Sequence, residues 1–302
     1  MRETKYYDQK NDRPLNLEVD GCALAKWHQS YGNALFAKHP KGFLIFLSPE
    51  MIEASDEYAD SDPYAVEQNI GSDFQRRRIE LTLELLLEAV ALIGGKPRVL
   101  DLGCGQGHIT EKMRQALPDA EITGLDASLS AVEYAHNHFS GIDFAVGDAY
   151  QCPYSKEYFD IVVCNNLWEH VPDPLFLLNR IRVVLKPGGF IIVSTPSRYR
   201  FSNLVRVLRG KPVAFMSQHH VTEYSVGQII EQLRYGGFQI IKIKSRPIAR
   251  GSLKAQLTRR LFSILISLVG SHHQLETTVF YLAQKTVPAK SIISNDKRMA
   301  LT

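Results

Sequence analysis

Cysteine is scarce in this sequence, and the few cysteines present are not grouped. The 302 residues include four cysteines: Cys22, Cys104, Cys152 and Cys164. None forms a Cys-x-x-Cys pair or shows the spacing of metal ligands, which argues against a zinc module and a disulfide framework. We therefore expect a reduced, cytoplasmic chain.

Long apolar runs and a strong charge imbalance are also missing. The longest apolar run, LFSILISLVG at 261–270, is too short to span a bilayer. The polar start, MRETKYYDQKNDRP, does not resemble a signal peptide. Lysine and arginine number 35 against 32 acidic residues, giving a net charge of +3, and this balance argues against a nucleic-acid-binding protein.

What the sequence does contain is an alternation of strand and helix patterns. Hydrophobic residues make up 45% of the chain, enough for a sizeable core. A helix is predicted at 76–95, and Ser225 and Gln228 have the capping-box spacing that starts another. Strands are predicted near 98–103, 121–127, 142–149, 159–166, 189–196, 238–245 and 277–285. The alternation predicts a parallel sheet with helices on both faces.

The segment RVLDLGCGQGHIT at 98–110 places three glycines between a predicted strand and a predicted helix. Such a loop lets the backbone approach a ligand, and the free N–H groups at the helix start attract an anion. Gly103, Gly105 and Gly107 follow Asp101 as D-x-G-x-G-x-G, which is not the dinucleotide fingerprint G-x-G-x-x-G. Asp101 would repel a pyrophosphate but attract a cationic amino-acid ligand.

Two further acids end the next two predicted strands. Asp126 is placed to bind the hydroxyls of a ribose, and Asp148 could accept a hydrogen bond from an adenine amino group. Each alone could equally be a solvated turn residue. Three acids at the carboxyl ends of three successive strands, where α/β proteins bind ligands, favour an adenosine-containing ligand instead.

From about Arg76 to Lys285 the chain resembles the class I S-adenosylmethionine-dependent methyltransferases. The resemblance is carried by VLDLGCGQGHIT, GLDAS, GDAY, FDIVVCNNLWEHVPDP and LKPGGFIIVSTPS. It implies a Rossmann-like α/β fold with a seven-stranded, mostly parallel sheet and an antiparallel last strand. It also implies S-adenosyl-L-methionine as cofactor. Within the class, CNNLWEHVPDP followed by LKPGG is similar to the ubiquinone-biosynthesis O-methyltransferase group.

The resemblance also implies which residues hold the cofactor. The glycines would line its methionine part, Asp126 would hold the ribose, and Asp148 with Ala149 would flank the adenine. Cys104 is expected to pack within the loop rather than to react. The full implied set is Asp101, Gly103, Cys104, Gly105, Gly107, Asp126, Ala127, Asp148, Ala149, Asn165 and Leu167.

A metal site is implied by the group but is not expected here. Members of the group carry a Glu-x-x-Glu-His arrangement that holds a divalent metal. This chain has Asn166 in place of the first carboxylate, followed by Glu169 and His170. Two ligands with a weak third make a poor site, so the prediction is that no metal binds.

For methyl transfer to a hydroxyl, a base is useful. His170 is the predicted base because the pKa of a histidine lies near neutrality, and Glu169 would orient it or contact the acceptor. Both residues could instead only fix the loop before the helix that begins near Asp173. His219 and His220 either face the acceptor pocket or are satisfied loop histidines.

The remaining segments are predicted to be additions to a core domain. The predicted division is an N-terminal extension or lid at 1–75, a methyltransferase domain at 76–285 with insertions at 197–221 and 249–276, and a disordered tail at 286–302. Tyr58, Tyr64 and Phe74 could close over the cofactor or simply pack on the surface. The first insertion is predicted to be irregular and basic, suited to a phosphate-linked acceptor or merely solvated. Residues 254–270 could contact a membrane surface, roof a pocket or pack on the core.

The leading interpretation is an enzyme that transfers a methyl group to a hydroxyl of a small-molecule or lipid- or glycan-linked acceptor. It is expected in the cytoplasm, with peripheral membrane contact as an option, and without a nucleic-acid partner. The alternative is a catalytically silent fold that binds S-adenosylmethionine and acts through a partner protein. The glycine spacing disfavours a dinucleotide-dependent oxidoreductase.

Overall fold

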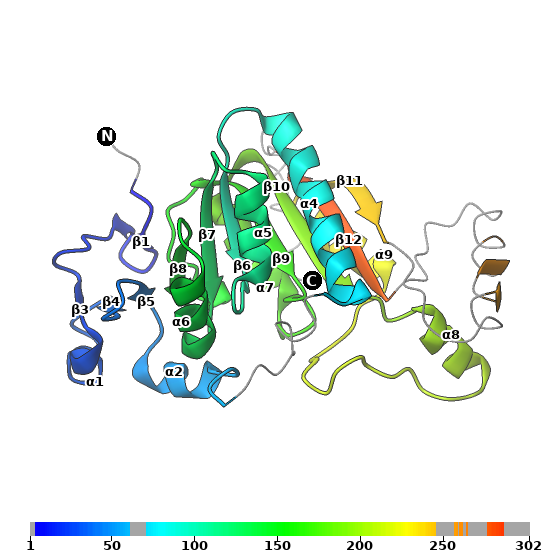
Figure 1. Cartoon of the computed structure of the whole chain (residues 1–302), viewed down its shortest axis with the longest axis horizontal. Coiled ribbons are helices and arrows are strands. Elements are labelled where there is room, and N and C mark those ends of the chain that lie inside the picture. Colours follow the sequence, from blue (N-terminus) through cyan, green and yellow to red (C-terminus); the bar gives the residue numbers. More distant parts are fainter. Residues whose placement is uncertain are drawn as a thin grey trace, which may run out of the picture.

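A single large sheet organises the computed structural model, which describes residues 4–60, 71–245, 257, 258, 260, 261, 264 and 277–286. Within these residues, ten strands pair in the order β11-β12-β10-β9-β6-β7-β8-β5-β4-β3 (Figure 1). A separate pair, β1 (Tyr7–Asp8) and β2 (Arg13–Pro14), lies near the start of the chain.

The seven predicted strands form the larger part of this sheet. They are β6 (Arg98–Leu102), β7 (Glu121–Asp126), β8 (Asp143–Val146), β9 (Phe159–Asn165), β10 (Leu185–Pro196), β11 (Phe238–Lys244) and β12 (Thr278–Lys285). Strands β6 to β10 pair in parallel, whereas β12 runs antiparallel between β10 and β11. The predicted Rossmann-like sheet with an antiparallel last strand is therefore confirmed.

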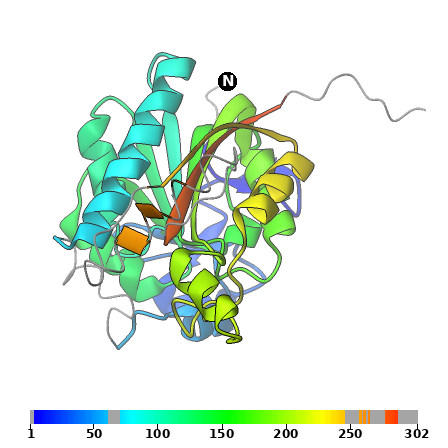
Figure 2. The same cartoon turned by 90° about the vertical axis from the view of Figure 1, so that its right-hand side faces the viewer.

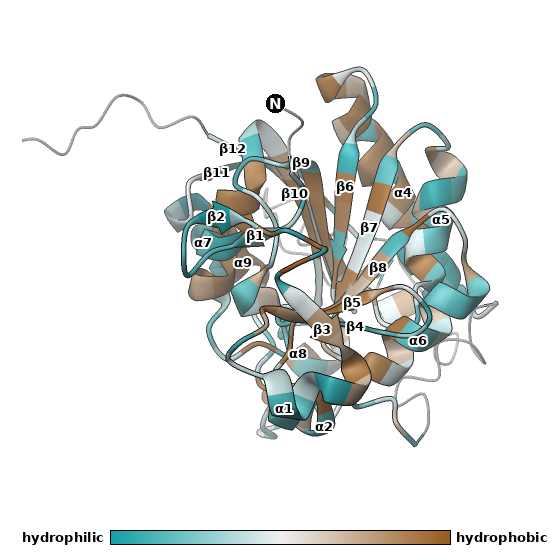
Figure 3. Ribbon diagram, turned by 90° about the vertical axis from the view of Figure 1, so that its left-hand side faces the viewer, coloured by the Kyte–Doolittle hydropathy of each residue, from teal (hydrophilic) through white to brown (hydrophobic). Residues whose placement is uncertain are grey.

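Helices cover both faces of the sheet, because the central strands are apolar on both sides. One face packs against α4 (Asp73–Ile93), α5 (His108–Ala116) and α6 (Leu129–His138), and the other against α7 (Pro174–Val184) and α9 (Val226–Tyr235). In Figure 2, α4 and α9 lie on opposite sides of β12. Along β9, Ile161 and Val163 enter one core while Val162 and Cys164 enter the other. This alternation gives the apolar central strands of Figure 3.

The predicted helix starts are present. Asp173 caps α7 by accepting a hydrogen bond of 3.0 Å from the backbone N–H of Phe176, and Pro174 occupies the first turn. Ser225 and Gln228 form the expected capping box of α9. These caps fix where the loops on the carboxyl side of the sheet end.

The N-terminal region adds three short strands to the seven predicted ones, and only for the apolar run GFLIFL at 42–47 did the sequence leave a strand open, as the alternative to a buried turn. They are β3 (Gly21–Ala23), β4 (Phe36–Lys38) and β5 (Leu44–Ile45), and β5 pairs in parallel with β8. Two or three residues are too few to show strand periodicity, which explains the omission. The predicted boundary at residue 75 is thus not an edge of the sheet. The region also contains α1 (Trp27–Ser30), η1 (Leu24–Lys26) and α2 (Pro49–Ser55).

The predicted insertion at 197–221 is not irregular throughout. Residues Phe201–Leu208 form α8, so the prediction is wrong for this stretch. No side chain caps the start of α8, so the usual sequence signal of a helix start is missing. Asn203 instead ties the helix to its surroundings, donating to the carbonyl of Arg198 and accepting from the N–H of Ala214.

Some predictions fall outside the described residues. They concern the tail from 287 and nearly all of the insertion at 249–276, including residues 254–270, for which membrane contact, a pocket roof and core packing are the alternatives. None of the described helices combines the length and apolar character that crossing a bilayer requires.

Candidate functional site

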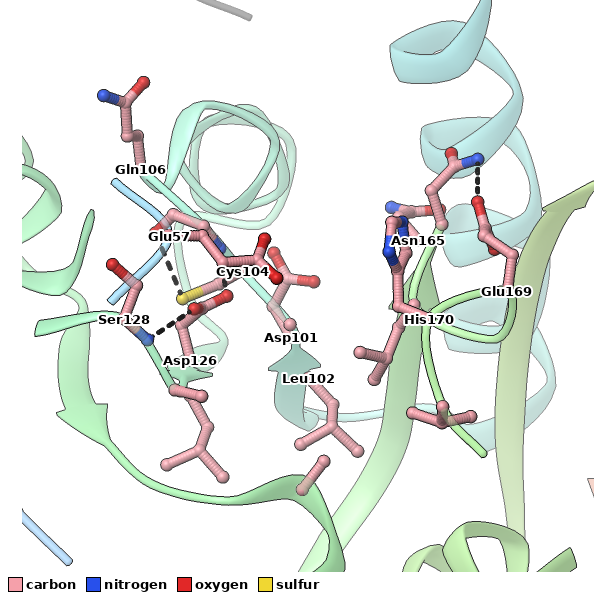
Figure 4. Close-up of a pocket in the computed structure, with 18 of the residues that line it drawn as sticks. Glu57, Asp101, Leu102, Cys104, Gln106, Asp126, Ser128, Asn165, Glu169 and His170 are labelled. Carbon is pink, nitrogen blue, oxygen red and sulfur yellow. Dashed lines mark hydrogen bonds between the residues drawn. The ribbon is translucent and has the colours of Figure 1, made fainter. Parts of the chain in front are cut away.

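A cavity of about 1010 Å³ lies at the carboxyl ends of β6, β7 and β9. This volume matches the upper range of small-molecule sites. Ten of the eleven predicted cofactor residues line it: Asp101, Gly103, Cys104, Gly105, Asp126, Ala127, Asp148, Ala149, Asn165 and Leu167. The exception is Gly107. The predicted catalytic residues, Glu169 and His170, also line the cavity, so the fold brings both sets together (Figure 4).

The glycine loop forms one wall of the cavity with bare backbone. Gly103 and Gly105 have φ angles of +78° and +52°, in the left-handed region that favours glycine. A Cβ on Gly105 would lie 3.0 Å from the hydroxyl of Tyr58, and one on Gly103 would lie 3.2 Å from Leu167. These glycines keep open a space that side chains would fill, as a close-bound ligand requires.

Gly107 has a different environment from the one predicted. Its φ is +77°, and a Cβ there would lie 2.9 Å from that of Ala135 and 3.0 Å from the ring of Phe144. Gly107 is also the N-cap residue of α5. It therefore lets α5 approach α6 and β8 closely, and it is not one of the residues that line the cavity.

Asp101 is a buried acid at the end of β6. It is 2% exposed and accepts a hydrogen bond of 2.6 Å from the hydroxyl of Thr110. Burial raises the pKa of Asp101 to about 7, because the charged form has lost its water. A cation in the cavity would stabilise that charged form, in keeping with the predicted cationic ligand.

The second acid holds the glycine loop against the end of β7. The carboxylate of Asp126 accepts from the N–H of Gly105 at 2.7 Å and from the N–H of Ser128 at 2.9 Å. Burial raises the pKa of Asp126, although both N–H groups act in the opposite direction. In Figure 4, Asp126 and Ser128 lie across the cavity from His170 and Glu169.

The third acid caps the short helix η2 (Ala149–Gln151) after β8. Asp148 accepts from the backbone N–H of Tyr150 at 2.9 Å. Asp148, Ala149 and Tyr150 all line the cavity beyond Asp126.

The segment after α2 and the start of α4 close another side of the cavity. Tyr58 and Phe74 line it, whereas Tyr64 lies outside the described residues. Asp56 anchors this segment to α6 by accepting from the hydroxyls of Ser128 and Ser130. The N-terminal region thus supplies part of the cavity wall.

Arg78 is a cavity residue that the sequence did not reveal. It donates to the side chain of Gln75 at 2.9 Å, while its buried Nε finds no hydrogen-bond partner among the described residues. Burial lowers the pKa of Arg78, although its usual value is so high that the group stays charged at neutral pH. The last arginine of a helical Arg-Arg-Arg run gave no signal that distinguished it from a surface residue.

Glu169 and His170 stand at the opposite end of the cavity, on the loop after β9. Glu169 is fully buried and accepts from the amide of Asn166 at 2.8 Å, and burial raises its pKa. Burial lowers the pKa of His170, so its ring is neutral at pH 7. The carbonyl of Glu169 accepts from the N–H groups of Val221 and Thr222, which joins this loop to the segment before α9.

The two neighbouring histidines before α9 separate in the structure. His220 lines the cavity, whereas His219 is exposed and is not a lining residue. The rings of His170 and His220 meet nearly at right angles, with centroids 5.0 Å apart. His220 also contacts the buried Glu223 at 2.9 Å, a partner that the sequence did not reveal.

The residues after β9 do not fit the oxygen-rich metal site of the resembled group. Asn166 turns an N–H toward Glu169, so it offers no oxygen there. Glu169, His170 and His220 present one donor atom each within 4.8 Å of one another, a set of one oxygen and two nitrogens. Hard divalent cations such as Mg²⁺ prefer oxygen ligands. This donor set therefore does not fit a magnesium ion.

Comparison with known proteins agrees with this geometry. The family model described as "Methyltransferase domain" matches residues 94–235. The ubiquinone biosynthesis O-methyltransferase of Bordetella avium is 34% identical over 140 residues, covering 44% of this chain and 56% of that protein. The Burkholderia thailandensis protein of the same name is 29% identical over 176 residues, covering 54% of this chain and 75% of that protein.

Solved structures share the fold at lower identity. An S-adenosylmethionine-dependent methyltransferase from Archaeoglobus fulgidus has a TM-score of 0.50 and 19% identity, covering 74% of this chain and all of that one. A Haloferax volcanii methyltransferase, solved in complex with the Trm112 methyltransferase activator, has a TM-score of 0.50 and 18% identity, with coverages of 74% and 94%.

The curated relatives match this chain over part of their length, 56% in the case of the Bordetella protein. The match includes the glycine loop and the residues after β9, and the family implies S-adenosyl-L-methionine as methyl donor. The chain therefore carries a class I S-adenosylmethionine-dependent methyltransferase domain, distantly related to the ubiquinone biosynthesis O-methyltransferases.

Proposed function

We propose that this protein transfers a methyl group from S-adenosylmethionine to a hydroxyl oxygen of a small-molecule or lipid- or glycan-linked acceptor. The observation that supports this most is one cavity shared by the glycine loop, Asp126 and the Glu169–His170 pair. A cofactor held by the first two would have its sulfonium, which lies between the methionine part and the ribose, facing the third. The name of the relatives, O-methyltransferase, supports oxygen as the methylated atom.

In this proposal different walls of the cavity bind different parts of the cofactor. The donor supplies an electrophilic methyl group on a positively charged sulfonium. Asp126 accepts hydrogen bonds from the ribose, and Asp148 with Ala149 flanks the adenine. Asp101 attracts the amino group of the methionine part, and the Nε of Arg78, which has no partner within the described part of the chain, donates to its carboxylate. Enclosure of the two reactants excludes water and aligns them.

On the acceptor side, a histidine of the cavity takes the hydroxyl proton. His170 is the candidate predicted from the sequence, and its lowered pKa keeps a lone pair available at neutral pH. Glu169 is fully buried and bound to Asn166, so its role in the proposal is to orient the loop. The N-terminal segment through Tyr58 acts as a lid, and the basic segment around α8 favours acidic acceptors.

The first test measures the affinity for the donor by calorimetry. S-adenosylmethionine and S-adenosylhomocysteine should bind to the purified protein, and NADH should not. Asp126→Ala should weaken binding roughly ten- to hundredfold, since hydrogen bonds to a charged group contribute about 1.5–3 kcal/mol. Asp119→Ala is the matched control, because the side chain of Asp119 is 80% exposed. Unchanged affinity in Asp126→Ala would contradict the cofactor assignment.

The second test concerns the acceptor. A donor with an isotopically labelled methyl group is offered with a panel of phenols and lipid-linked sugars, and label transfer to oxygen is read by mass spectrometry. Transfer to nitrogen or carbon would contradict the proposed atom. If the protein binds the donor but transfers no label to any member of the panel, the alternative of a silent binding fold is favoured.

A further inference from the structure

A buried charged network lies behind the acceptor end of the cavity. Glu223 is fully buried, and Arg200, which is 7% exposed, donates to its Oε2. The other oxygen, Oε1, accepts from the N–H of Met216 and contacts Nδ1 of His220 at 2.9 Å. Every oxygen of this carboxylate therefore has a partner.

Such a network is costly to bury, and each of its members is held from several sides. Arg200 also donates to the carbonyls of Ser197 and Ala214, which ties the end of β10 to the segment before α9. Burial raises the pKa of Glu223, but hydrogen bonds from His220, Met216 and Arg200 outweigh it and leave the pKa below its ordinary value. Glu223 is thus a carboxylate at neutral pH.

The carboxylate determines which nitrogen of His220 carries hydrogen. An ionised Glu223 can only accept hydrogen bonds, so Nδ1 of His220 must donate to it. In the neutral ring this leaves the lone pair on Nε2. The side chain of His220 is 7% exposed and lines the cavity. A fixed tautomer on a cavity wall is the arrangement that proton transfer requires.

We propose that His220 is the catalytic base of the methyl transfer and that Glu223 is its positioning residue, an inference that rests on the proposed function. The acceptor oxygen forms a bond to the methyl carbon while the carbon–sulfur bond breaks and its electron pair stays on sulfur. The hydroxyl proton moves to Nε2 of His220. The resulting imidazolium donates through Nδ1 to Glu223, and it returns the proton to water after the product leaves.

His220 is better equipped for this step than its neighbour His170. The imidazolium formed on His220 faces a carboxylate, whose charge stabilises it as the acidic member of a catalytic triad stabilises its histidine. The pKa of His170 is lowered by burial and by His220. The other charged groups around the pair include Glu169, which is bound to Asn166, and Arg200, which is neutralised by Glu223. Glu57 also lines the cavity and acts to raise the pKa of His170, but burial and His220 outweigh it.

The first experiment needs no acceptor. Full-length protein labelled with ¹⁵N in its histidines is saturated with S-adenosylhomocysteine, and the ring nitrogens are observed by NMR between pH 6 and 8. His220 is assigned by its loss in His220→Gln. The expected signal is a neutral ring with hydrogen on Nδ1 at pH 8. A ring with hydrogen on Nε2, or one that stays an imidazolium at pH 8, would overturn the proposal.

The second experiment uses an acceptor that the wild type methylates in the panel above. His220→Ala should lower kcat roughly 10²-fold or more, the usual contribution of a general base, with S-adenosylhomocysteine affinity unchanged. Added imidazole should restore part of the rate, which a purely structural role would not allow. His219→Ala is the matched control: an adjacent but exposed histidine, whose loss should leave kcat and KM as in the wild type.

Two further results would overturn the proposal. One is full activity in His220→Ala together with a large loss in His170→Ala. The other is a loss of activity when a chelator is added, with recovery when a divalent cation is supplied, which would assign these side chains to metal binding.

The positioning role of Glu223 is tested separately. Glu223→Gln should shift the pH dependence of kcat and leave the donor affinity unchanged. If this variant fails to fold, the NMR result decides. Loss of donor binding by the wild type would count against the proposed function instead.

Discussion

Asp101 illustrates how a single residue can couple the site to stability. It lies at the end of β6 with almost no exposure, and its carboxylate accepts a hydrogen bond from the hydroxyl of Thr110. A carboxyl group this deep is costly to ionise, and burial raises its pKa to about 7. Near neutral pH the apoprotein therefore holds an acid that is only partly charged until a cation arrives.

This shift predicts a pH dependence of unfolding. In the unfolded chain the pKa of an aspartate is about 3.9. Between about pH 4 and pH 7 the folded protein binds a proton that the unfolded chain has released, so stability falls as the pH rises and levels off above 7. Asp101→Asn removes this titration and keeps an oxygen for Thr110. The free energy of unfolding of this variant in urea, relative to that of the wild type, should therefore increase from pH 5 to pH 7.

The upper limit of that gain is roughly 3 kcal/mol, because the interval from pH 5 to pH 7 spans two pH units and one proton contributes about 1.4 kcal/mol for each. Asp119→Asn, at an exposed acid, should follow the wild-type curve at every pH. Asp126 and Glu169 also have raised pKa values, but they remain in both proteins, so the difference between the curves reports Asp101. Parallel curves for Asp101→Asn and wild type would show that Asp101 titrates normally.

Residues of the site were predictable where chain order sets their position. Asp101, Asp126 and Asp148 end successive strands, and parallel strands bring their carboxyl ends to one edge. Arg78 and Glu223 were not predicted, because tertiary packing alone brings α4 and the segment before α9 to the cavity. His220 was recognised, but its neighbour His219 shares its sequence context, so the choice between them needed the structure.

At the scale of elements, the glycine loop shows that one motif can serve two purposes. Gly105 faces the cavity, whereas Gly107 faces Ala135 of α6 and Phe144 of β8. Both have positive φ, so the sequence pattern treats them alike. The difference lies in what surrounds each Cβ position: open space and one tyrosine hydroxyl for the first, core side chains for the second.

Alanine should therefore affect mainly the stability of the fold at position 107 and mainly the affinity for the cofactor at position 105. Gly107→Ala would press a methyl group against Ala135 and Phe144, and should destabilise the fold by roughly 1–3 kcal/mol or more in urea unfolding. Gly105→Ala should lose less stability but bind S-adenosylhomocysteine much more weakly in calorimetry. The interpretation is contradicted if Gly107→Ala retains wild-type stability, or if Gly105→Ala retains wild-type affinity.

Elements were predictable in proportion to their length and to the clarity of their end signals. The long apolar strands β9 and β10 and the capped helices α7 and α9 were recognised. Helix α8 was missed because no side chain caps its start, and β3 and β4 because three residues form no periodic pattern. For β5 the sequence left a strand and a buried turn as alternatives. The place of β5 is set by its pairing with β8, a contact distant in sequence, and β4 and β3 follow from β5.

At the scale of the whole molecule, these short strands change what the N-terminal region is. Phe36 and Ile45 are completely buried, and Phe36 packs in the same core as residues of β6, β9 and α7. Trp27 is 2% exposed and donates from its indole N–H to the carbonyl of Leu47 at 2.9 Å. A region that shares the sheet and the core of the domain should unfold with it.

The two tryptophans of the chain make this testable, because one lies in each part. Trp27 belongs to the N-terminal region, and the fully buried Trp168 lies on the loop after β9. Trp27→Phe and Trp168→Phe each leave one fluorescent reporter. If the region is part of one cooperative unit, each variant should show a fluorescence transition in urea that coincides with its own far-UV circular dichroism. A Trp27 signal that changes at lower urea than the circular dichroism of the same variant would instead make the N-terminal region, residues 4–60, a separately unfolding extension. In that case the cavity wall formed by Tyr58 would open without loss of the fold.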